Sequence, residues 1–143
     1  MTEIVLLGGK VRKQALAVVQ PSSNPQSPTL KRLMLPQGEL AQFYDGEEGI
    51  RYIAQIELQA GSLRGNHYHR IKQEWIYIMS GEVTIIVQDL ESGTRETALL
   101  RSGDLAFIQT GVVHTLQVIK SGQAIEFSTA RFDPADIYRQ KLV

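Results

Sequence analysis

The clearest alternation of apolar and polar positions in the chain begins at residue 50. From Ile50 to Gln59 every second side chain is apolar, and only Ile53 breaks this period of two, which is typical of a strand with one buried face. Further runs of strand length follow at residues 74–79, 83–88, 95–100, 104–108, 113–119 and 124–128. Most of these runs are separated by pairs that carry glycine: Ser80-Gly81, Ser92-Gly93, Ser102-Gly103, Thr110-Gly111 and Ser121-Gly122. Turn signals about every 8–12 residues between short strands predict an all-β sandwich or barrel.

The pattern is weaker before residue 50. Residues 4–7 predict a short strand that ends at a glycine pair, and residues 15–19 form a second apolar run that fits a strand or a helix. The segment Gln20–Thr29 holds three of the five prolines, which predicts a loop. We therefore divide the chain into an N-terminal β arm with a Pro/Ser-rich loop, residues 1–34, and a single barrel domain, residues 35–143.

Composition narrows the range of partners. The chain of 143 residues has 15 basic and 15 acidic side chains, so its formal net charge is zero and it lacks the basic surface that binds nucleic acid or anionic lipid. It has no cysteine, which excludes disulfides and thiolate ligands. The N-terminus does not have the charge order of a signal peptide, and no apolar run approaches a membrane span, so we expect a cytoplasmic protein.

Near the other end of the chain, Asp133 as a cap and Pro134 at the first helical position predict one short helix.

The three histidines and one glutamate are the candidate chemistry. In a strand, His67 and His69 share one face because they are two residues apart. Alternation also places His114 on the same face as Val112 and Leu116, and Glu74 on the same face as Ile76 and Ile78. These faces are apolar, and an inward carboxylate is costly unless it is paired or bound to a cation. If His67, His69, Glu74 and His114 converge in a barrel, they form a site for a divalent transition metal with three nitrogen ligands and one oxygen ligand.

A purely structural role is the alternative for each of these residues taken alone. A single buried histidine is more often a hydrogen-bonded core residue than a ligand, and a His-X-His pair arises by chance in many chains. What favours a metal site is the combination, because every histidine in the chain stands at a position that the site requires. Imidazole and carboxylate suit Zn, Mn, Fe, Ni, Co and Cu, so the ligand types leave the identity of the metal open.

The spacing of these residues resembles the two motifs of the cupin superfamily of small β-barrels, over roughly residues 35–130. The first motif is filled at every fixed position, by Gly61, His67, His69, Glu74 and Gly81. The second is matched by Gly103, Gly111 and His114, but Gln109 replaces the usual proline and Val118 the usual asparagine. The resemblance implies a double-stranded β-helix, or jelly-roll barrel, with His67, His69, Glu74 and His114 as metal ligands. It also implies a homodimer, in which the N-terminal arm could take part.

A weaker resemblance links the chain to the sugar-nucleotide epimerase and isomerase branch of this barrel. In that branch an Arg-Gly pair precedes the histidine-bearing strand, and the histidine acts as a base on a keto-sugar; Arg64-Gly65 and His67 hold those positions here. The rhamnose-pathway epimerases of that branch lack the second histidine and bind no metal. The presence of His69 and Glu74 departs from their pattern.

Three functions follow as hypotheses. We favour a metal-binding enzyme, isomerase-like or oxygenase-like, that acts on a small polar and carbohydrate-derived molecule inside the barrel. His67, Arg64 and Tyr77 are the candidate catalytic residues, and Tyr52 is a further candidate for the rim. The alternatives are a metal-free sugar-nucleotide epimerase or isomerase with a histidine base, and a non-enzymatic module that binds or senses a small molecule. All three predict a small-molecule ligand and no nucleic-acid or membrane partner.

Overall fold

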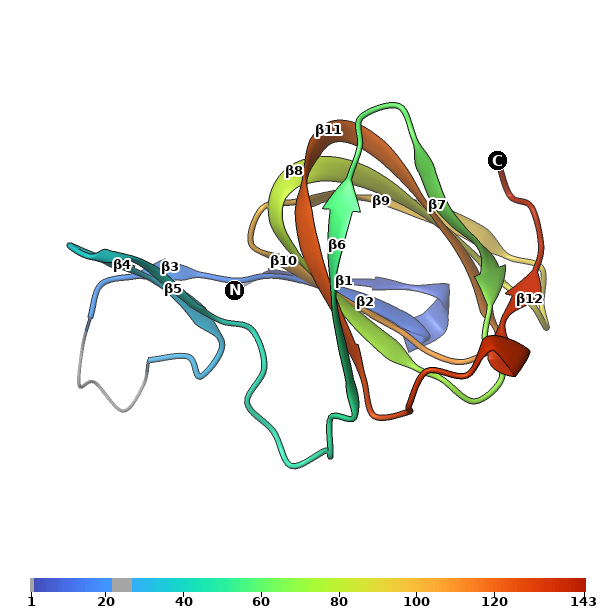
Figure 1. Ribbon diagram of the computed structural model, residues 1–143, viewed down its shortest axis with the longest axis horizontal. Helices are drawn as coiled ribbons and strands as arrows, with labels where there is room; N and C mark the ends of the chain where they lie inside the picture. The colour runs from blue at the N-terminus through green and yellow to red at the C-terminus, as the bar shows by residue number, and fades with distance from the viewer. Residues whose placement is uncertain (1, 22–26) are drawn as a thin grey trace.

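The computed structural model describes residues 2–21 and 27–143, and these residues form an almost entirely β structure (Figure 1). The predicted all-β class and the jelly-roll barrel are therefore confirmed. Nine strands form the sheet that closes into the barrel: β1 (Thr2–Leu6), β2 (Val11–Ala15), β6 (Tyr52–Leu58), β7 (Leu63–Tyr68), β8 (Glu74–Asp89), β9 (Arg95–Arg101), β10 (Asp104–Ile108), β11 (Val112–Ser128) and β12 (Tyr138–Arg139). A second sheet of three strands projects from the barrel and consists of β3 (Val18–Val19), β4 (Lys31–Leu35) and β5 (Gly38–Gln42).

Two long strands, β8 and β11, form the centre of the barrel sheet. They pair antiparallel along their length, and β11 also pairs with β7 and β6 on its other side. The sequence predicted four strands here, separated by turns at Ser80-Gly81 and Ser121-Gly122, and both predicted turns are wrong. Gly81 has a positive φ of 93°, and a side chain on Gly122 would overlap the carbonyl of Ser80. The two glycine sites therefore let the paired strands bend together and continue.

The other three glycine pairs do form turns. Ser92-Gly93 lies in the connection between β8 and β9, Ser102-Gly103 in the one between β9 and β10, and Thr110-Gly111 in the one between β10 and β11. The strand predicted from residue 50 is confirmed as β6, with Ile56 and Leu58 buried on its inner face. Ile53, which breaks the alternation, points outward and is 69 % exposed.

The N-terminal residues form a hairpin that joins the barrel sheet. β1 and β2 are connected by a 3-10 turn, η1 (Leu7–Gly9), and β2 pairs with β10. The apolar run at residues 15–19 is not one element, because β2 ends at Ala15 and β3 begins at Val18 in the other sheet. The division of the chain after residue 34 stays a prediction. Residues 22–26 of the predicted Gln20–Thr29 loop lie outside the described residues.

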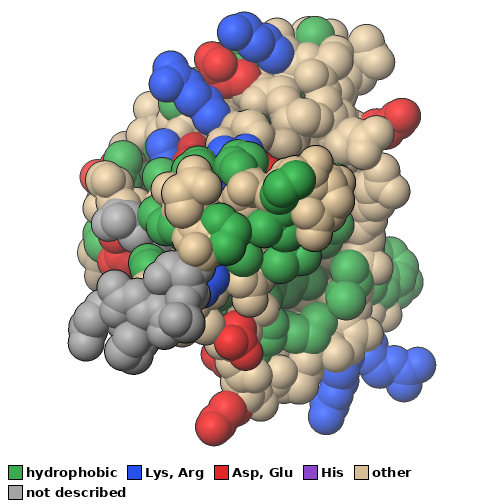
Figure 2. All heavy atoms as spheres, turned by 90° about the vertical axis from the view of Figure 1, so that its left-hand side faces the viewer, with side chains coloured by type: hydrophobic (Ala, Val, Ile, Leu, Met, Phe, Trp, Pro, Cys, Tyr) green, Lys and Arg blue, Asp and Glu red, His purple; other side chains and the backbone are tan. Residues whose placement is uncertain are grey.

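Two apolar clusters hold these layers together. One fills the barrel and consists mainly of Ile, Leu and Val side chains, among them Ile78, Ile85, Val87, Leu100 and Val112. The other lies between the outer face of the barrel and the segment around β5, and is largely aromatic: Phe43, Tyr44, Trp75, Tyr77 and Phe127. Figure 2 views the molecule from the side of the three-stranded sheet and shows hydrophobic side chains gathered on that face. The histidines lie in the barrel, on the side away from this aromatic cluster.

The predicted C-terminal helix is a single 3-10 turn, η2 (Pro134–Asp136). The carboxylate of Asp133 accepts a hydrogen bond from the backbone N–H of Ala135 at 2.9 Å, as the cap was expected to do. After the turn, β12 pairs with β7, the strand that carries His67. In the described part of the chain, no helix has the length and apolar character that crossing a membrane requires.

Candidate metal centre

The strand β7 brings His67 into the barrel through a β-bulge. His67 pairs with His114 of β11, whereas Gly65 pairs with Thr115, so Asn66 is the extra residue between the two pairs. Both residues of the bulge have positive φ, 100° for Gly65 and 56° for Asn66. Such a bulge re-aims the side chains that follow it. The sequence predicted that Arg64-Gly65 precedes the histidine strand, but not that Gly65 and Asn66 form this bend.

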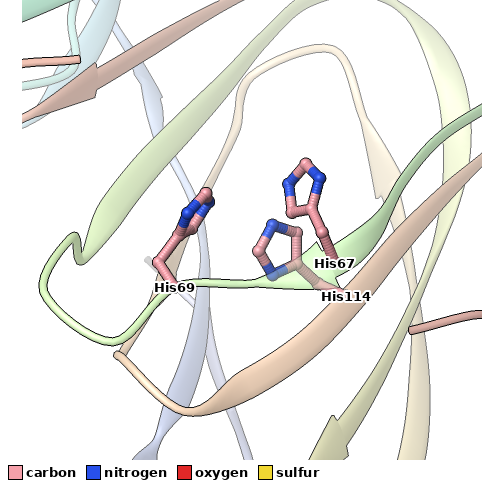
Figure 3. Close-up of side chains that lie close together, drawn as sticks. All are labelled: His67, His69 and His114. Atoms are coloured by element: carbon pink, nitrogen blue, oxygen red, sulfur yellow. The ribbon is translucent and has the colours of Figure 1, made fainter. Parts of the chain in front are cut away.

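The three histidines form one cluster (Figure 3). Each of them offers a ring nitrogen to the same small region, and the three nitrogen atoms lie within 4.8 Å of one another. The ring centroids of His67 and His114 are 4.8 Å apart, and those of His67 and His69 are 4.9 Å apart. His67 belongs to β7, His114 to β11, and His69 to the loop just after β7. The structure thus brings together the three histidines that the sequence predicted.

Hydrogen bonds hold the outer nitrogens of two of these rings. The Nδ1–H of His69 donates to the carbonyl of Asp136 at 2.8 Å, and that of His114 donates to the carbonyl of Val112 at 3.0 Å. The Nε2 atoms of both rings are therefore turned toward the cluster. Two buried ring nitrogens, Nδ1 of His67 and Nε2 of His69, have no hydrogen-bond partner among the described residues. Unpartnered buried nitrogens are costly and rare, and a cation between the rings would satisfy them, so the donor set fits a transition metal.

Glu74, the first residue of β8, lies beside the histidine cluster and is buried. Its Oε1 atom is 2.8 Å from Nε2 of His114, and its Oε2 atom is 3.3 Å from Nζ of Lys72. Burial by itself would raise the pKa of this carboxyl, but the adjacent His114 holds it well below its usual range. The fourth residue predicted as a ligand therefore contacts a ring nitrogen of the cluster.

Burial controls the charge of the histidines. It lowers the pKa of His67 to about 3, with the neighbouring His114 and His69 adding to the effect, and it also lowers the pKa of His69. Both rings are thus neutral at neutral pH and keep a free lone pair, as ligation requires. For His114 burial acts in the same direction, but the carboxylate of Glu74 outweighs it and raises the pKa.

Sequence reasoning missed two charged residues of the site, Lys72 and Glu126. Nζ of Lys72 lies 2.5 Å from Oε1 of Glu126 and 4.7 Å from the centre of the Tyr52 ring. Burial, followed by the nearby Glu74, raises the pKa of Glu126 to about 7. Alternation did hold a signal, because Glu126 shares the inward face of β11 with the buried Ala124. The signal was weak, because Ile125 and Phe127 make the opposite face equally apolar.

Two cavities open onto the histidine cluster. One has a volume of about 250 Å³ and is lined by Arg64, His67, Glu74, His114 and Glu126 together with aliphatic side chains. The other, of about 180 Å³, reaches His67 and His69 from the side of Tyr52 and Lys72. Arg64 and Tyr52, both candidates from the sequence, thus line the two approaches to the cluster.

Tyr77, the third candidate catalytic residue, lies elsewhere. Its ring is buried in the aromatic cluster outside the barrel and stacks on Phe43 with 4.3 Å between the ring centroids. It faces away because it alternates with Ile76 and Ile78, which point into the barrel core. The structure therefore does not bring Tyr77 together with the histidines.

A comparison with protein families matches residues 54–128, more than half of the chain, to the family described as Cupin domain. Among characterised proteins, an oxalate decarboxylase from Arthroderma benhamiae is 29 % identical over 83 residues. The match covers 58 % of this chain but only 18 % of that enzyme. This chain therefore corresponds to a small part of that relative.

Several solved structures share the fold. The epimerase RmlC of Legionella pneumophila, solved with dTDP-4-keto-L-rhamnose, superposes with a TM-score of 0.76 over 99 % of this chain and 78 % of its own, at 14 % identity. The rmlC epimerase of Mycobacterium tuberculosis superposes with a TM-score of 0.74, covering 97 % of this chain and 72 % of its own, also at 14 % identity. A TDP-quinovose 3,4-ketoisomerase from Campylobacter jejuni superposes with a TM-score of 0.68, covering 78 % of this chain and 89 % of its own, at 19 % identity. At these identities the likeness is one of fold.

Proposed function

The chain belongs to the cupin family, and we propose that it is a metal-binding enzyme acting on a small, polar, carbohydrate-derived molecule inside the barrel. The observation that carries the proposal is the pair of buried nitrogens on His67 and His69 that lack partners among the described residues. Both belong to a cluster of three imidazoles whose ligand atoms lie within 4.8 Å of one another. The fold likeness to sugar-nucleotide epimerases and to a ketoisomerase supports the substrate class.

His67, His69 and His114 would hold the metal, and Glu74 would complete the set. His114 would ligate through Nε2, because its Nδ1–H is engaged with Val112. Glu74 already contacts that Nε2 atom, so its carboxylate is within reach of a cation bound there. When bound, the metal would supply Lewis acidity toward a carbonyl or enolate oxygen, or with iron the activation of dioxygen.

The protein side chains around the cluster would bind and orient the substrate. Arg64 lines the larger cavity and offers a guanidinium to a keto, carboxylate or phosphate oxygen. Lys72 lines the smaller cavity, where its ammonium group is held between Glu126 and Glu74. A cavity of about 250 Å³ lies at the small end of ligand sites, so the reacting part of the substrate would be no larger than a single sugar ring.

A metal-free epimerase or isomerase is the second candidate. The contact between Glu74 and His114 favours this candidate, because the contact closes a hydrogen-bonded network without a cation. In that case His67 is the general base and Arg64 holds a phosphate or keto oxygen. Burial counts against it, because a histidine whose pKa is lowered to about 3 is a weak base at neutral pH.

Metal analysis of protein purified without chelator tests the metal site. We expect stoichiometric transition metal in the wild type as purified, whereas His67→Ala and His69→Ala should retain none through purification and bind added metal only weakly. Tyr68→Phe is the matched control, because Tyr68 lies between the two histidines but stacks on Tyr138 on the other face. Glu74→Gln should weaken the affinity without unfolding the barrel. A wild type that takes up no transition metal contradicts this part of the proposal.

Turnover is tested separately. For an epimerase or isomerase we expect deuterium from solvent to enter the carbon next to the carbonyl of a keto-sugar, and for an oxygenase we expect consumption of dioxygen. Full turnover after the metal has been stripped would support the metal-free candidate. Tight binding of a sugar ligand without turnover would identify a binding or sensing module.

We also propose that the protein is a homodimer in which the three-stranded sheet takes part. This sheet exposes the apolar side chains of Val18, Met34 and Leu40. Figure 2 shows hydrophobic side chains gathered on the side of the molecule that carries this sheet. Light scattering should give the mass of a dimer, and Leu40→Lys should shift it toward the monomer. Ile119→Lys, at a similarly exposed position in β11, is the control. A monomeric wild type contradicts this proposal.

A further inference from the structure

We infer that Asp136, in the C-terminal 3-10 turn, is a positioning residue for His69 and sets which ring nitrogen faces the cluster. Its role for a bound metal rests on the function proposed above. The two residues are 67 positions apart in the chain, but the Nδ1–H of His69 donates to the backbone carbonyl of Asp136 at 2.8 Å. A carbonyl oxygen only accepts, so this contact places the ring proton on Nδ1 and leaves the lone pair on Nε2.

His69 needs such a partner more than the other two histidines do. His67 lies within β7, where sheet pairing with His114 on one side and Arg139 on the other fixes its backbone. His69 follows the end of β7 and begins the loop that leads to β8 at Glu74. The strand pairing of β7 does not extend to His69, although its backbone carbonyl accepts a hydrogen bond from the N–H of Gly111 at 2.8 Å. That bond does not orient the ring, so the ring orientation of His69 depends on its side-chain contact with Asp136.

The carboxylate of Asp136 organises the loop that follows His69. It accepts hydrogen bonds from three consecutive backbone N–H groups, those of Arg70 at 2.8 Å, Ile71 at 3.1 Å and Lys72 at 2.9 Å. These bonds compensate for the burial of Asp136, which is 5 % exposed as a residue. One residue thus holds the ring of His69 with its carbonyl and the next three residues with its side chain. The hydrogen bond to the backbone of Lys72 also helps to place its side chain beside Glu126.

Asp136 can do this because its own position is fixed on both sides. Asp133 caps the 3-10 turn through Ala135, and the backbone N–H of Asp136 donates to the carbonyl of Asp133 at 3.0 Å. Two residues later, Tyr138 pairs with Tyr68 of β7. The turn is therefore attached to the strand that carries His67.

The replacement Asp136→Asn tests this role, with Asp133→Asn as the matched control. Asparagine caps a helical turn about as well as aspartate, so the control should leave His69 undisturbed. In Asp136→Asn an amide replaces one acceptor oxygen beside the three N–H groups, so the loop loosens and the carbonyl moves away from His69. We expect a 10–100-fold loss of Zn²⁺ or Co²⁺ affinity, the usual effect of removing an outer partner of a ligand histidine.

Two further measurements separate positioning from general damage. In a His69→Ala background, Asp136→Asn should have almost no additional effect on residual Co²⁺ affinity, and an equal loss in both backgrounds overturns the inference. Nitrogen-15 NMR of the metal-free wild type should show the Nδ1–H tautomer of His69, and the Nε2–H tautomer there overturns it. The NMR result stands even if the wild type binds no metal or Asp136→Asn fails to fold, so it is independent of the proposed function.

Discussion

Gly65 passes so close to His114 that a Cβ atom on Gly65 would lie 2.6 Å from the carbonyl oxygen of His114. This contact lies in the bulge that turns His67 into the barrel, next to the pair that His67 forms with His114. The glycine therefore serves two needs at once. Its φ of 100° disfavours any residue with a side chain, and its missing side chain lets the two histidine strands approach each other.

Gly65→Ala should consequently destabilise the protein more than Gly61→Ala does. Gly61 also has a positive φ, 83°, but apart from its two chain neighbours no described residue has an atom within 4 Å of the position where its Cβ would be. Replacing Gly61 should cost about 1–2 kcal/mol from backbone strain alone, and replacing Gly65 a further 1–3 kcal/mol or so from overpacking. Urea unfolding measures both free energies. Equal losses in the two variants would mean that the close approach to His114 does not matter.

Asn66, the other residue of the bulge, links the C-terminal residues to the histidine strands by hydrogen bonds. Its Oδ1 atom accepts hydrogen bonds from Oγ1 of Thr115 at 2.7 Å and from the backbone N–H of Leu142 at 2.8 Å. Asn66→Gly removes these bonds but suits the φ of 56°, and should cost about 1–3 kcal/mol. Asn66→Ala should cost about 1 kcal/mol more, because alanine also strains the backbone.

Hydrogen exchange supplies the second readout for Asn66. The backbone amides of Leu142 and Val143 should exchange faster in both variants than in the wild type, because both amides donate to Oδ1 of Asn66. An alanine variant as stable as the glycine variant would show that the positive φ carries no cost at this position.

Tyr77 should prove structural. Tyr77→Phe keeps the ring that stacks on Phe43, so metal uptake and turnover should stay at the wild-type level. Tyr77→Ala empties a buried aromatic site and should lower the free energy of unfolding by about 3–5 kcal/mol. Calorimetric metal titration and thermal unfolding check the two outcomes. A tenfold loss of turnover in Tyr77→Phe would contradict this prediction and would indicate that the Tyr77 hydroxyl takes part in catalysis.

The ion pair between Lys10 and Asp89 should make stability depend on pH in the acid range. Nζ of Lys10 lies 3.0 Å from Oδ1 of Asp89, and this bond together with that from Ser92 keeps the pKa of Asp89 below its ordinary value of 3.8. A carboxyl with a lowered folded-state pKa stabilises the protein above its unfolded-state pKa, and the contribution is lost as the pH falls through the folded-state value. Wild type should therefore be more stable than Asp89→Asn at neutral pH.

This advantage of the wild type should stay constant down to the ordinary carboxyl pKa and then shrink as the pH falls further. Urea unfolding midpoints across that range measure it. A difference between the two proteins that persists or grows under more acid conditions would show that the charge of Asp89 is not the cause.

The sequence predicted the barrel and the four candidate metal ligands because both depend on short-range patterns. Alternation placed β6, and it placed Glu74 and His114 on inward faces. Glycine was ambiguous: the same Ser-Gly signal marks a turn at Gly93 but a bend within a continuous strand at Gly81. Only the pairing partner decides between these outcomes, and Gly81 lies against the backbone around Lys120, far along the chain.

Asp136 and Glu126 escaped prediction for a related reason. The role of Asp136 depends on a carbonyl that meets His69 across 67 positions, and a carbonyl carries no sequence signal. Glu126 belongs to a run with apolar residues on both faces, so alternation could not say which face points inward. Long-range geometry decides both cases.

The continuity of β11 has a consequence for exchange with solvent. Around His114 this strand has β8 on one side and β7 on the other, and farther along β6 takes the place of β7. With both edges occupied, the strand cannot separate locally, so its central amide protons should be released only by global opening of the domain. A group held at His114 would then leave through the cavity that His114 lines, without separation of β11 from its neighbours. The lifetime of such a complex would depend on its bonds to the side chains that hold it, so a change that only makes the barrel more stable should not lengthen it.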